Sequence, residues 1–185
     1  MAQIKVLALV GSLRAASINR QLAELAVAAA PDDVSVTVFD GLGELPFYNE
    51  DIDPAVGADV EAPAAVAALR AAAADADAAL VVTPEYNGSI PGVVKNAIDW
   101  LSRPFGNGAF KGKPLAVIGG SLGQYGGVWA HDETRKSFGI AGARVVEAIK
   151  LSVPFKSLNG QHPREHAELV ASVRDVVGKL AAEVD

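Results

Sequence analysis

Short runs of aliphatic and β-branched residues alternate along this chain with longer segments that have the pattern of helices. The apolar runs cover 4–10, 34–39, 78–83, 115–119 and 145–153, and each has the length of a β-strand. The helical segments are 19–30, 61–74, 92–101, 128–138 and 163–183. Regular alternation of strand and helix predicts an α/β protein with a parallel sheet.

The first and third apolar runs are hydrophobic almost without a break. Residues 4–10 read IKVLALV, and residues 78–82 read AALVV. A strand covered by helices on both faces buries every side chain, whereas a strand with one face in water alternates apolar and polar positions. We therefore expect both runs at the centre of the sheet.

One long connection interrupts the alternation. Residues 40–63 are rich in glycine, proline and acidic residues and predict an irregular segment that folds over the surface. Such a segment acts as a lid or an oligomer contact, or it is a plain surface excursion. The rest of the chain contains no linker and no internal repeat, so we expect one domain over residues 1–185.

Composition disfavours several kinds of protein. The formal net charge of −6 argues against a nucleic-acid surface. Because the chain contains no cysteine, a thiolate or a disulfide plays no part, and redox chemistry requires a bound cofactor. No apolar stretch approaches the roughly 18 residues of a membrane span, and no signal peptide precedes the first strand, so we expect a cytoplasmic protein.

The three histidines, His131, His162 and His166, have no spacing typical of metal ligands. We therefore expect them at the surface or at helix caps and expect no metal site.

The loop after the first strand has the chemistry of an anion site. Residues 11–20 read GSLRAASINR and lead directly into a predicted helix, whose first N–H groups and positive dipole end attract anions. Ser12, Ser17 and Asn19 add side-chain donors, and Arg14 adds a planar cation suited to phosphate. Open α/β sheets bind ligands at the carboxyl ends of their strands, where this loop lies.

The same residues have a plainer explanation, in which Ser17 or Asn19 caps the helix and Arg14 is a solvated surface residue.

The absence of two common nucleotide-binding motifs narrows the choice of ligand. The first strand is not followed by G-x-G-x-x-G, and G-x-x-x-x-G-K-[ST] occurs nowhere, which disfavours a dinucleotide site and a P-loop. A mononucleotide phosphate is the ligand that fits best.

The loop after the third strand, residues 83–92, reads TPEYNGSIPG. Its prolines and glycines constrain the backbone, Tyr86 offers a flat face, and Asn87 offers both a donor and an acceptor. This combination predicts recognition of a planar heterocycle with polar edges. The alternative is a rigid turn whose side chains satisfy only the neighbouring backbone.

The fourth strand ends in a glycine-rich loop, residues 119–127, which reads GGSLGQYGG and lets the backbone approach a ligand closely. The pattern G-x-S-x-G around Ser121 also matches the nucleophile elbow of α/β-hydrolases. An acid and a histidine follow in the order of a catalytic triad, Asp132 and then His162 or His166. A serine hydrolase is therefore an alternative, although it leaves the phosphate loop without a function.

The first two loops together resemble those of a known family. Residues 11–14 (GSLR), 17–20 (SINR), 84–92 (PEYNGSIPG) and 95–100 (KNAIDW) are similar to motifs of the NAD(P)H-dependent FMN reductases, and the chromate and quinone reductases are the branch they resemble most. The similarity covers most of the chain in order and spacing. It implies a flavodoxin-like three-layer α/β fold: a five-stranded parallel sheet of order 2-1-3-4-5, with helices on both faces and FMN at the switch point beside the first strand.

The resemblance also implies a cofactor site on particular residues. By motif match, the residues expected to hold the FMN phosphate are Ser12, Arg14, Ser17 and Asn19. Those expected to border the flavin ring are Pro84, Glu85, Tyr86 and Asn87, and a third side is expected from Gly120 and Ser121. No side chain is assigned as a catalytic acid or base, since flavin N5 carries the chemistry.

The reaction implied by the resemblance begins when NADH or NADPH passes hydride to FMN. The electrons then go to a small-molecule acceptor such as a quinone, an azo compound, chromate, ferric ion or free flavin. The family is commonly dimeric or tetrameric, so a homodimer or homotetramer is expected. The alternative outside enzymes is a flavodoxin-type electron carrier, which is disfavoured because the first loop lacks the threonine-rich signature of that group.

Overall fold

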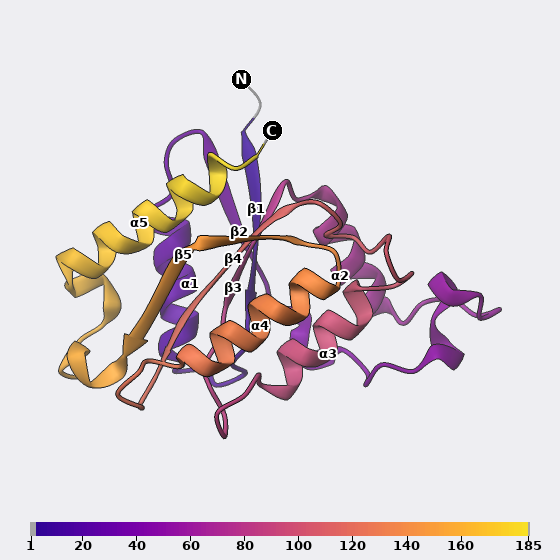
Figure 1. Ribbon diagram of the computed structural model, residues 1–185, viewed down its shortest axis with the longest axis horizontal. Helices are drawn as coiled ribbons and strands as arrows, with labels where there is room; N and C mark the ends of the chain where they lie inside the picture. Colours follow the sequence, from indigo (N-terminus) through magenta and orange to yellow (C-terminus); the bar gives the residue numbers. More distant parts are fainter. Residues whose placement is uncertain (1–2, 185) are drawn as a thin grey trace.

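The computed structural model describes residues 3–184 and contains one five-stranded sheet between two layers of helices (Figure 1). Its strands are β1 (Ile4–Val10), β2 (Val34–Phe39), β3 (Ala78–Val82), β4 (Pro114–Ser121) and β5 (Arg144–Pro154). Its α-helices are α1 (Ile18–Ala28), α2 (Ala64–Asp75), α3 (Gly92–Leu101), α4 (Val128–Ile140) and α5 (Ala167–Ala181). Each strand and helix predicted from the sequence is present, with ends that differ by a few residues.

The sheet has the order β2-β1-β3-β4-β5, and every neighbouring pair is parallel, as predicted. The unbroken hydrophobic strands β1 and β3 lie inside the sheet. After β2 the chain returns past β1 to add β3 on its other side, so the direction of winding reverses between β1 and β3. Ligands of open α/β sheets bind outside the carboxyl ends of the strands at such a switch point.

Alternate side chains of β1 belong to two different cores, because successive side chains of a strand point to opposite faces. Val6, Ala8 and Val10 pack with residues of α1 and α5, whereas Leu7 and Leu9 pack with residues of α2, α3 and α4. Burial on both faces explains why this strand carries almost no polar residue.

The predicted last helix is divided in the structure. A short 3-10 turn at Pro163–Glu165 precedes α5, and His166 between them has an extended backbone (φ −100°, ψ 98°) that ends the turn. His162 caps the turn, since its Nδ1 accepts a hydrogen bond from the Arg164 N–H (3.2 Å). The expected capping role of a histidine is confirmed at this position.

The long segment 40–63 contains three short 3-10 turns and is fastened to α3. The carbonyl of Pro46 accepts hydrogen bonds from the Asn96 side chain (2.9 Å) and from the Trp100 indole (2.8 Å). The N–H of Tyr48 donates to the side-chain oxygen of Asn96 (2.9 Å). Two residues of the KNAIDW motif therefore satisfy the backbone of this segment.

A buried ion pair fastens the same segment to α2. Asp53 is 0 % exposed and accepts two hydrogen bonds from the guanidinium of Arg70, at 2.7 and 2.8 Å. Arg70 also donates to the carbonyl of Trp100 (2.9 Å). With its polar groups satisfied in this way, the segment is part of the folded body and not a loose lid.

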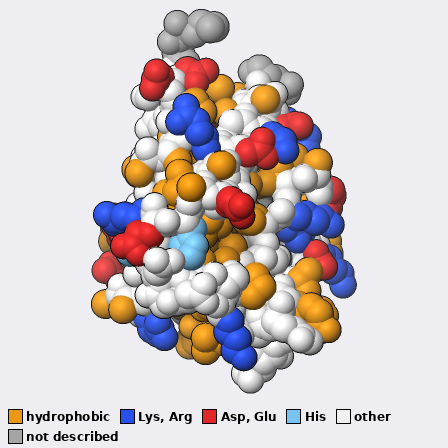
Figure 2. Space-filling model, turned by 90° about the vertical axis from the view of Figure 1, so that its left-hand side faces the viewer, with side chains coloured by type: hydrophobic (Ala, Val, Ile, Leu, Met, Phe, Trp, Pro, Cys, Tyr) orange, Lys and Arg blue, Asp and Glu red, His pale blue; other side chains and the backbone are white. Residues whose placement is uncertain are grey.

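The surface carries charges of both signs. On the face shown in Figure 2, basic side chains lie singly among acidic and hydrophobic ones, without the continuous basic strip that binds a nucleic-acid backbone. Within residues 3–184, no helix has the length and hydrophobicity that spanning a bilayer requires.

Candidate functional site

Two adjoining clefts lie at the carboxyl edge of the sheet, where the loops after β1, β3 and β4 meet. They have volumes of about 370 and 320 Å³, and Arg14 and Tyr86 line both. Eight of the ten residues predicted for the cofactor site line the larger cleft: Ser12, Arg14, Ser17, Asn19, Pro84, Glu85, Tyr86 and Ser121. Asn87 and Gly120 are not among the lining residues of either cleft.

The loop after β1 leaves backbone donors free. Gly11 N–H donates to the Val82 carbonyl (2.9 Å) and Ser17 N–H to the Arg14 carbonyl (3.2 Å). The amides of residues 12–16, between these two, donate to no other backbone group of the described chain. They therefore remain available to an anion at the amino end of α1, where the helix dipole adds to the attraction.

The side chains of this loop divide their roles. Ser17 caps α1, since its hydroxyl oxygen accepts a hydrogen bond from the Arg20 N–H (3.3 Å). Arg14 is exposed, and one of its terminal nitrogens donates to the Ala16 carbonyl (3.0 Å). Arg14 lines both clefts, and phosphate binding by its remaining donors stays a prediction.

Asn19 is 2 % exposed and bonds the first loop to the third. Its amide donates to the Gly120 carbonyl (3.0 Å), and its side-chain oxygen accepts from the Gly120 N–H (2.9 Å). The two residues are 101 positions apart in the chain. Phosphate binding by Asn19 stays a prediction, whereas a clamp between two loops is what its contacts form.

The third loop approaches the sheet too closely for a side chain at Gly119. A Cβ atom there would lie 2.1 Å from the Thr83 carbonyl oxygen, and the backbone has φ +152°. Glycine is therefore required at this position of β4, beside the end of β3.

Glu85 joins the second loop to α4. Its carboxylate accepts hydrogen bonds from the N–H groups of Trp129 (3.1 Å) and Ala130 (3.2 Å) at the amino end of that helix. A carboxylate is stabilised there by the free amides and the dipole. The Ser89 hydroxyl adds a second link by donating to Glu133 (2.6 Å).

Asn87 lies at the tip of a tight turn. Tyr86 and Ser89 exchange backbone hydrogen bonds (3.2 and 3.0 Å), and Asn87 and Gly88 between them both have positive φ, 54° and 73°. Asparagine followed by glycine is the usual sequence of such a turn. The turn presents the half-exposed Tyr86 ring to both clefts, and a contact of Asn87 with the flavin stays a prediction.

The geometry of a serine hydrolase is absent from the described residues. Ser121 Oγ accepts from the Gly123 N–H (3.3 Å), and no histidine bonds to it within residues 3–184. Asp132 pairs instead with Arg135 (2.8 Å). A catalytic serine requires a base within hydrogen-bond reach. The nucleophile-elbow motif at Ser121 is therefore not accompanied by a catalytic triad in the described residues.

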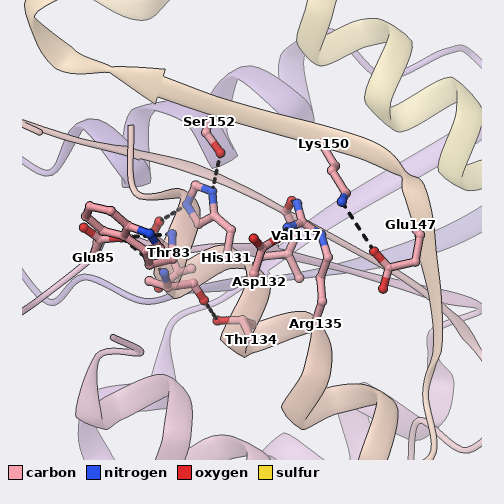
Figure 3. A network of polar contacts seen from close by, with 12 residues as sticks. Thr83, Glu85, Val117, His131, Asp132, Thr134, Arg135, Glu147, Lys150 and Ser152 are labelled. Carbon is pink, nitrogen blue, oxygen red and sulfur yellow. Dashed lines mark hydrogen bonds and ion pairs between the residues drawn. The ribbon is translucent and has the colours of Figure 1, made fainter. Parts of the chain in front are cut away.

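His131 corrects the expectation of surface histidines, because it is 0 % exposed. Its ring lies between the ends of two strands, with Nε2 3.0 Å from the Thr83 carbonyl oxygen and Nδ1 2.7 Å from Ser152 Oγ (Figure 3). Burial is the main cause that lowers the pKa of His131 below its ordinary value. The ring is therefore kept neutral beneath the second and third loops.

Arg135, one turn further along α4, is also buried. Its guanidinium donates to the Val117 carbonyl (2.8 Å), at the point where the pairing of β4 with β5 shifts register (Figure 3). Sequence reasoning did not single out this residue or the buried place of His131. The sequence signal that could have revealed this burial is the helical spacing of 131, 134, 135 and 138. This spacing places His131 on the buried face of α4 that carries Phe138.

No group of three or more histidine, aspartate or glutamate residues suited to a metal ion occurs in the part of the chain that the structure describes. His166 Nε2 lies 3.0 Å from the Leu158 carbonyl oxygen, in a local contact near the start of α5.

Comparison with known proteins identifies the family. The family model for NADPH-dependent FMN reductase matches residues 4–157. A 2-hydroxy-1,4-benzoquinone reductase of a Burkholderia species is 45% identical over 132 residues, which cover 71% of this chain and 68% of the relative. A quinone reductase of Pseudomonas putida is 41% identical over 182 residues, which cover 97% of this chain and 87% of the relative.

A solved structure supports the same conclusion. The flavoenzyme NAD(P)H:(acceptor) oxidoreductase FerB of Paracoccus denitrificans superposes with a TM-score of 0.82 at 31% identity, covering 98% of this chain and 97% of FerB. The predicted fold, cofactor and reaction class are confirmed by these matches. The chain belongs to the NADPH-dependent FMN reductase family.

Proposed function

We propose that this protein holds FMN in the cleft between its first three loops and uses it to reduce quinones with NADH or NADPH. The observation that carries this proposal is the meeting of an anion-binding loop, the Tyr86 turn and a glycine-rich loop around one cleft. Quinone is the acceptor in the names of two relatives that are 45% and 41% identical to this chain, which supports the choice of substrate.

The donor set of the cleft fits FMN. The first loop offers the free amides of 12–16 and the Arg14 guanidinium, which suit a phosphate. The same cleft is lined by the ring of Tyr86 and by apolar side chains from Leu122 and Phe155, which suit a flat heterocycle. The volumes of about 370 and 320 Å³ each lie in the range of about 300–1,000 Å³ that small-molecule sites occupy.

Binding and orientation are the tasks of the protein in this reaction. When FMN is bound, the transfer of two electrons from the reduced nicotinamide to the acceptor is supplied by the flavin ring. Arg14 and the loop amides neutralise the phosphate, and Tyr86 orients the ring. Asn19 and Glu85 hold the three loops together, and no side chain of the cleft is assigned a proton-transfer role.

An absorption spectrum tests the proposal. The purified protein is expected to show the two visible bands of a flavin, which bleach under anaerobic conditions on addition of NADH or NADPH and return when benzoquinone is added. Absence of flavin, together with failure of added FMN to bind or to support NAD(P)H oxidation, would contradict it. Flavin binding without rapid oxidation of NAD(P)H would indicate the electron-carrier alternative.

We further infer a homodimer or homotetramer that uses two exposed segments. Phe47, in the segment 40–63, is 87% exposed, and Phe105, in the segment 100–110, is 75% exposed. Large exposed apolar side chains are typical of interaction surfaces when several lie together. A sharp monomer peak of the flavin-loaded protein in size-exclusion chromatography with light scattering would exclude this assembly.

We also propose a cytoplasmic location, which fractionation of cells would test.

A further inference from the structure

His131 connects the end of β3, whose loop borders the candidate site, with β5. The carbonyl oxygen of Thr83 only accepts, so the ring nitrogen facing it, Nε2, carries a proton and donates (3.0 Å). In the neutral ring, Nδ1 is then the acceptor for the Ser152 hydroxyl (2.7 Å). One tautomer of one side chain therefore satisfies a group at the end of β3 and a group on β5 (Figure 3).

The ring also fills the space beneath the third loop. A Cβ atom at Gly119 would lie 2.9 Å from His131 Nε2, and one at Gly127 would lie 3.2 Å from the same atom. The backbone of both loop ends therefore packs directly on the imidazole. Moving the ring would displace the loop that borders the cleft.

The second loop is tied to the same turn of α4 from two sides. Glu85 accepts from the first free amides of the helix, and Thr83, two residues earlier, accepts from His131. Pro84 between them lines the larger cleft. The position of Pro84 is therefore set on one side by a helix terminus and on the other by the imidazole.

We propose that His131 is a positioning residue of the flavin site, which holds the second and third loops at the spacing the flavin ring requires without touching the cofactor itself. The inference rests on the proposed function, because it assumes that these loops bind FMN. The Thr83 contact carries it for the second loop and the packing of Gly119 and Gly127 on the ring carries it for the third, while Ser152 fixes the tautomer.

Acid pH is expected to weaken this arrangement. The charged groups that face His131 are Glu85 from the second loop and Asp132 and Arg135 from its own helix, and the contacts from β4 and β5 are uncharged. A protonated ring donates from both nitrogens, so Ser152 must reverse its hydroxyl and the buried cation lies near Arg135. FMN affinity is therefore expected to be full while the ring is neutral, above the lowered pKa of His131, and to fall as pH drops through that pKa.

Two variants and a matched control test the proposal, with FMN dissociation constants measured by flavin fluorescence from about pH 5 to 8. H131Q can still donate to Thr83 and accept from Ser152 but does not titrate, so it is expected to bind FMN at neutral pH like the wild type. Its acid decline is expected to be smaller than that of the wild type, because only the decline caused by the FMN phosphate, whose second pKa is about 6, remains. H131L leaves the Thr83 carbonyl unpaired and is expected to bind FMN about tenfold to a hundredfold more weakly. H162N keeps a helix cap, removes a histidine outside the site, and is expected to retain the wild-type profile.

Circular dichroism and urea unfolding accompany each titration, so that weak binding by an unfolded H131L is recognised. In that event the pH profile of H131Q decides the question. Equal acid declines in wild type and H131Q, or an unchanged affinity in folded H131L, would each overturn the proposal. Failure of the wild type to bind FMN at neutral pH would instead remove the proposed function.

Discussion

Two irregular segments of this protein satisfy their polar groups differently. Between residues 45 and 53, the backbone and Asp53 are bonded to Asn96, Trp100 and Arg70 of the helices. Between residues 12 and 16, the amides have no backbone partner in the described chain. The second segment is the more exposed of the two, since residues 13–16 are exposed whereas Leu45 and Asp53 are buried, so its amides are open to solvent or to a ligand.

The comparison teaches how to separate loops that stabilise the fold from loops that bind a ligand. Buried polar groups are almost always paired, and a segment whose pairs are all internal contributes to folding. A run of unpaired amides beside a cation and a helix terminus is stabilised by an external anion. Substitutions in the two segments should therefore change different measured quantities.

The largest effect is expected from Arg70→Met, which keeps the aliphatic stem and removes the charge. Asp53 would remain as a buried carboxylate without its partner, and breaking a buried ion pair in this way costs about 3–5 kcal/mol. The free energy of unfolding of the flavin-free protein, measured in urea, should fall by that amount. FMN affinity of the molecules that remain folded should change little, and a selective loss of FMN affinity would contradict the separation of the two segments.

The same pair adds an acid dependence to stability. Hydrogen bonds from Arg70 are the main cause that lowers the pKa of Asp53 below its ordinary value. Because this pKa is lowered by folding, the stabilisation is present above the ordinary carboxyl pKa and is lost as pH falls through the lowered one. Unfolding experiments on wild type and Arg70→Met at acid pH should therefore show a smaller difference than at neutral pH.

Arg14→Ala is expected to have an intermediate effect, which changes FMN affinity and not the free energy of unfolding. Loss of a hydrogen bond to a charged phosphate should weaken FMN binding by about 1.5–3 kcal/mol. The free energy of unfolding without FMN should change by no more than about 0.5 kcal/mol, because the side chain is exposed and bonds only locally, to Ala16. Unchanged retention of flavin would remove Arg14 from the site.

The smallest effects are expected at Ser17, which caps α1 and is also predicted to bind the phosphate. Ser17→Ala removes the cap of α1 and should lower the free energy of unfolding by about 1 kcal/mol. Ser17→Asp keeps a cap but places a negative charge beside the predicted phosphate. Stability near the wild type with weaker FMN binding in Ser17→Asp would place Ser17 at the phosphate. Equal FMN affinity in both variants would leave Ser17 with capping alone.

Most of the fold was predictable from the chain because its signals are local. The unbroken hydrophobicity of 4–10 and 78–82 reflects burial on both faces, and both segments are inner strands of the sheet. The eight cleft-lining residues were predictable because the loop after each strand has a motif whose letters lie next to one another. The division of the last helix at His166 was not predicted, since its periodicity continues through the turn.

What the sequence by itself determined is the alternation of strands and helices, the family, and the three loops whose residues line one cleft. Only the tertiary structure decided that Asn19 clamps Gly120, that Arg70 neutralises Asp53, and that His131 is buried between Thr83 and Ser152. These pairs are 101, 17, 48 and 21 residues apart along the chain. Hydrophobic periodicity and turn chemistry act between near neighbours, whereas the partner of a buried polar group is chosen by the folded geometry that brings distant segments together.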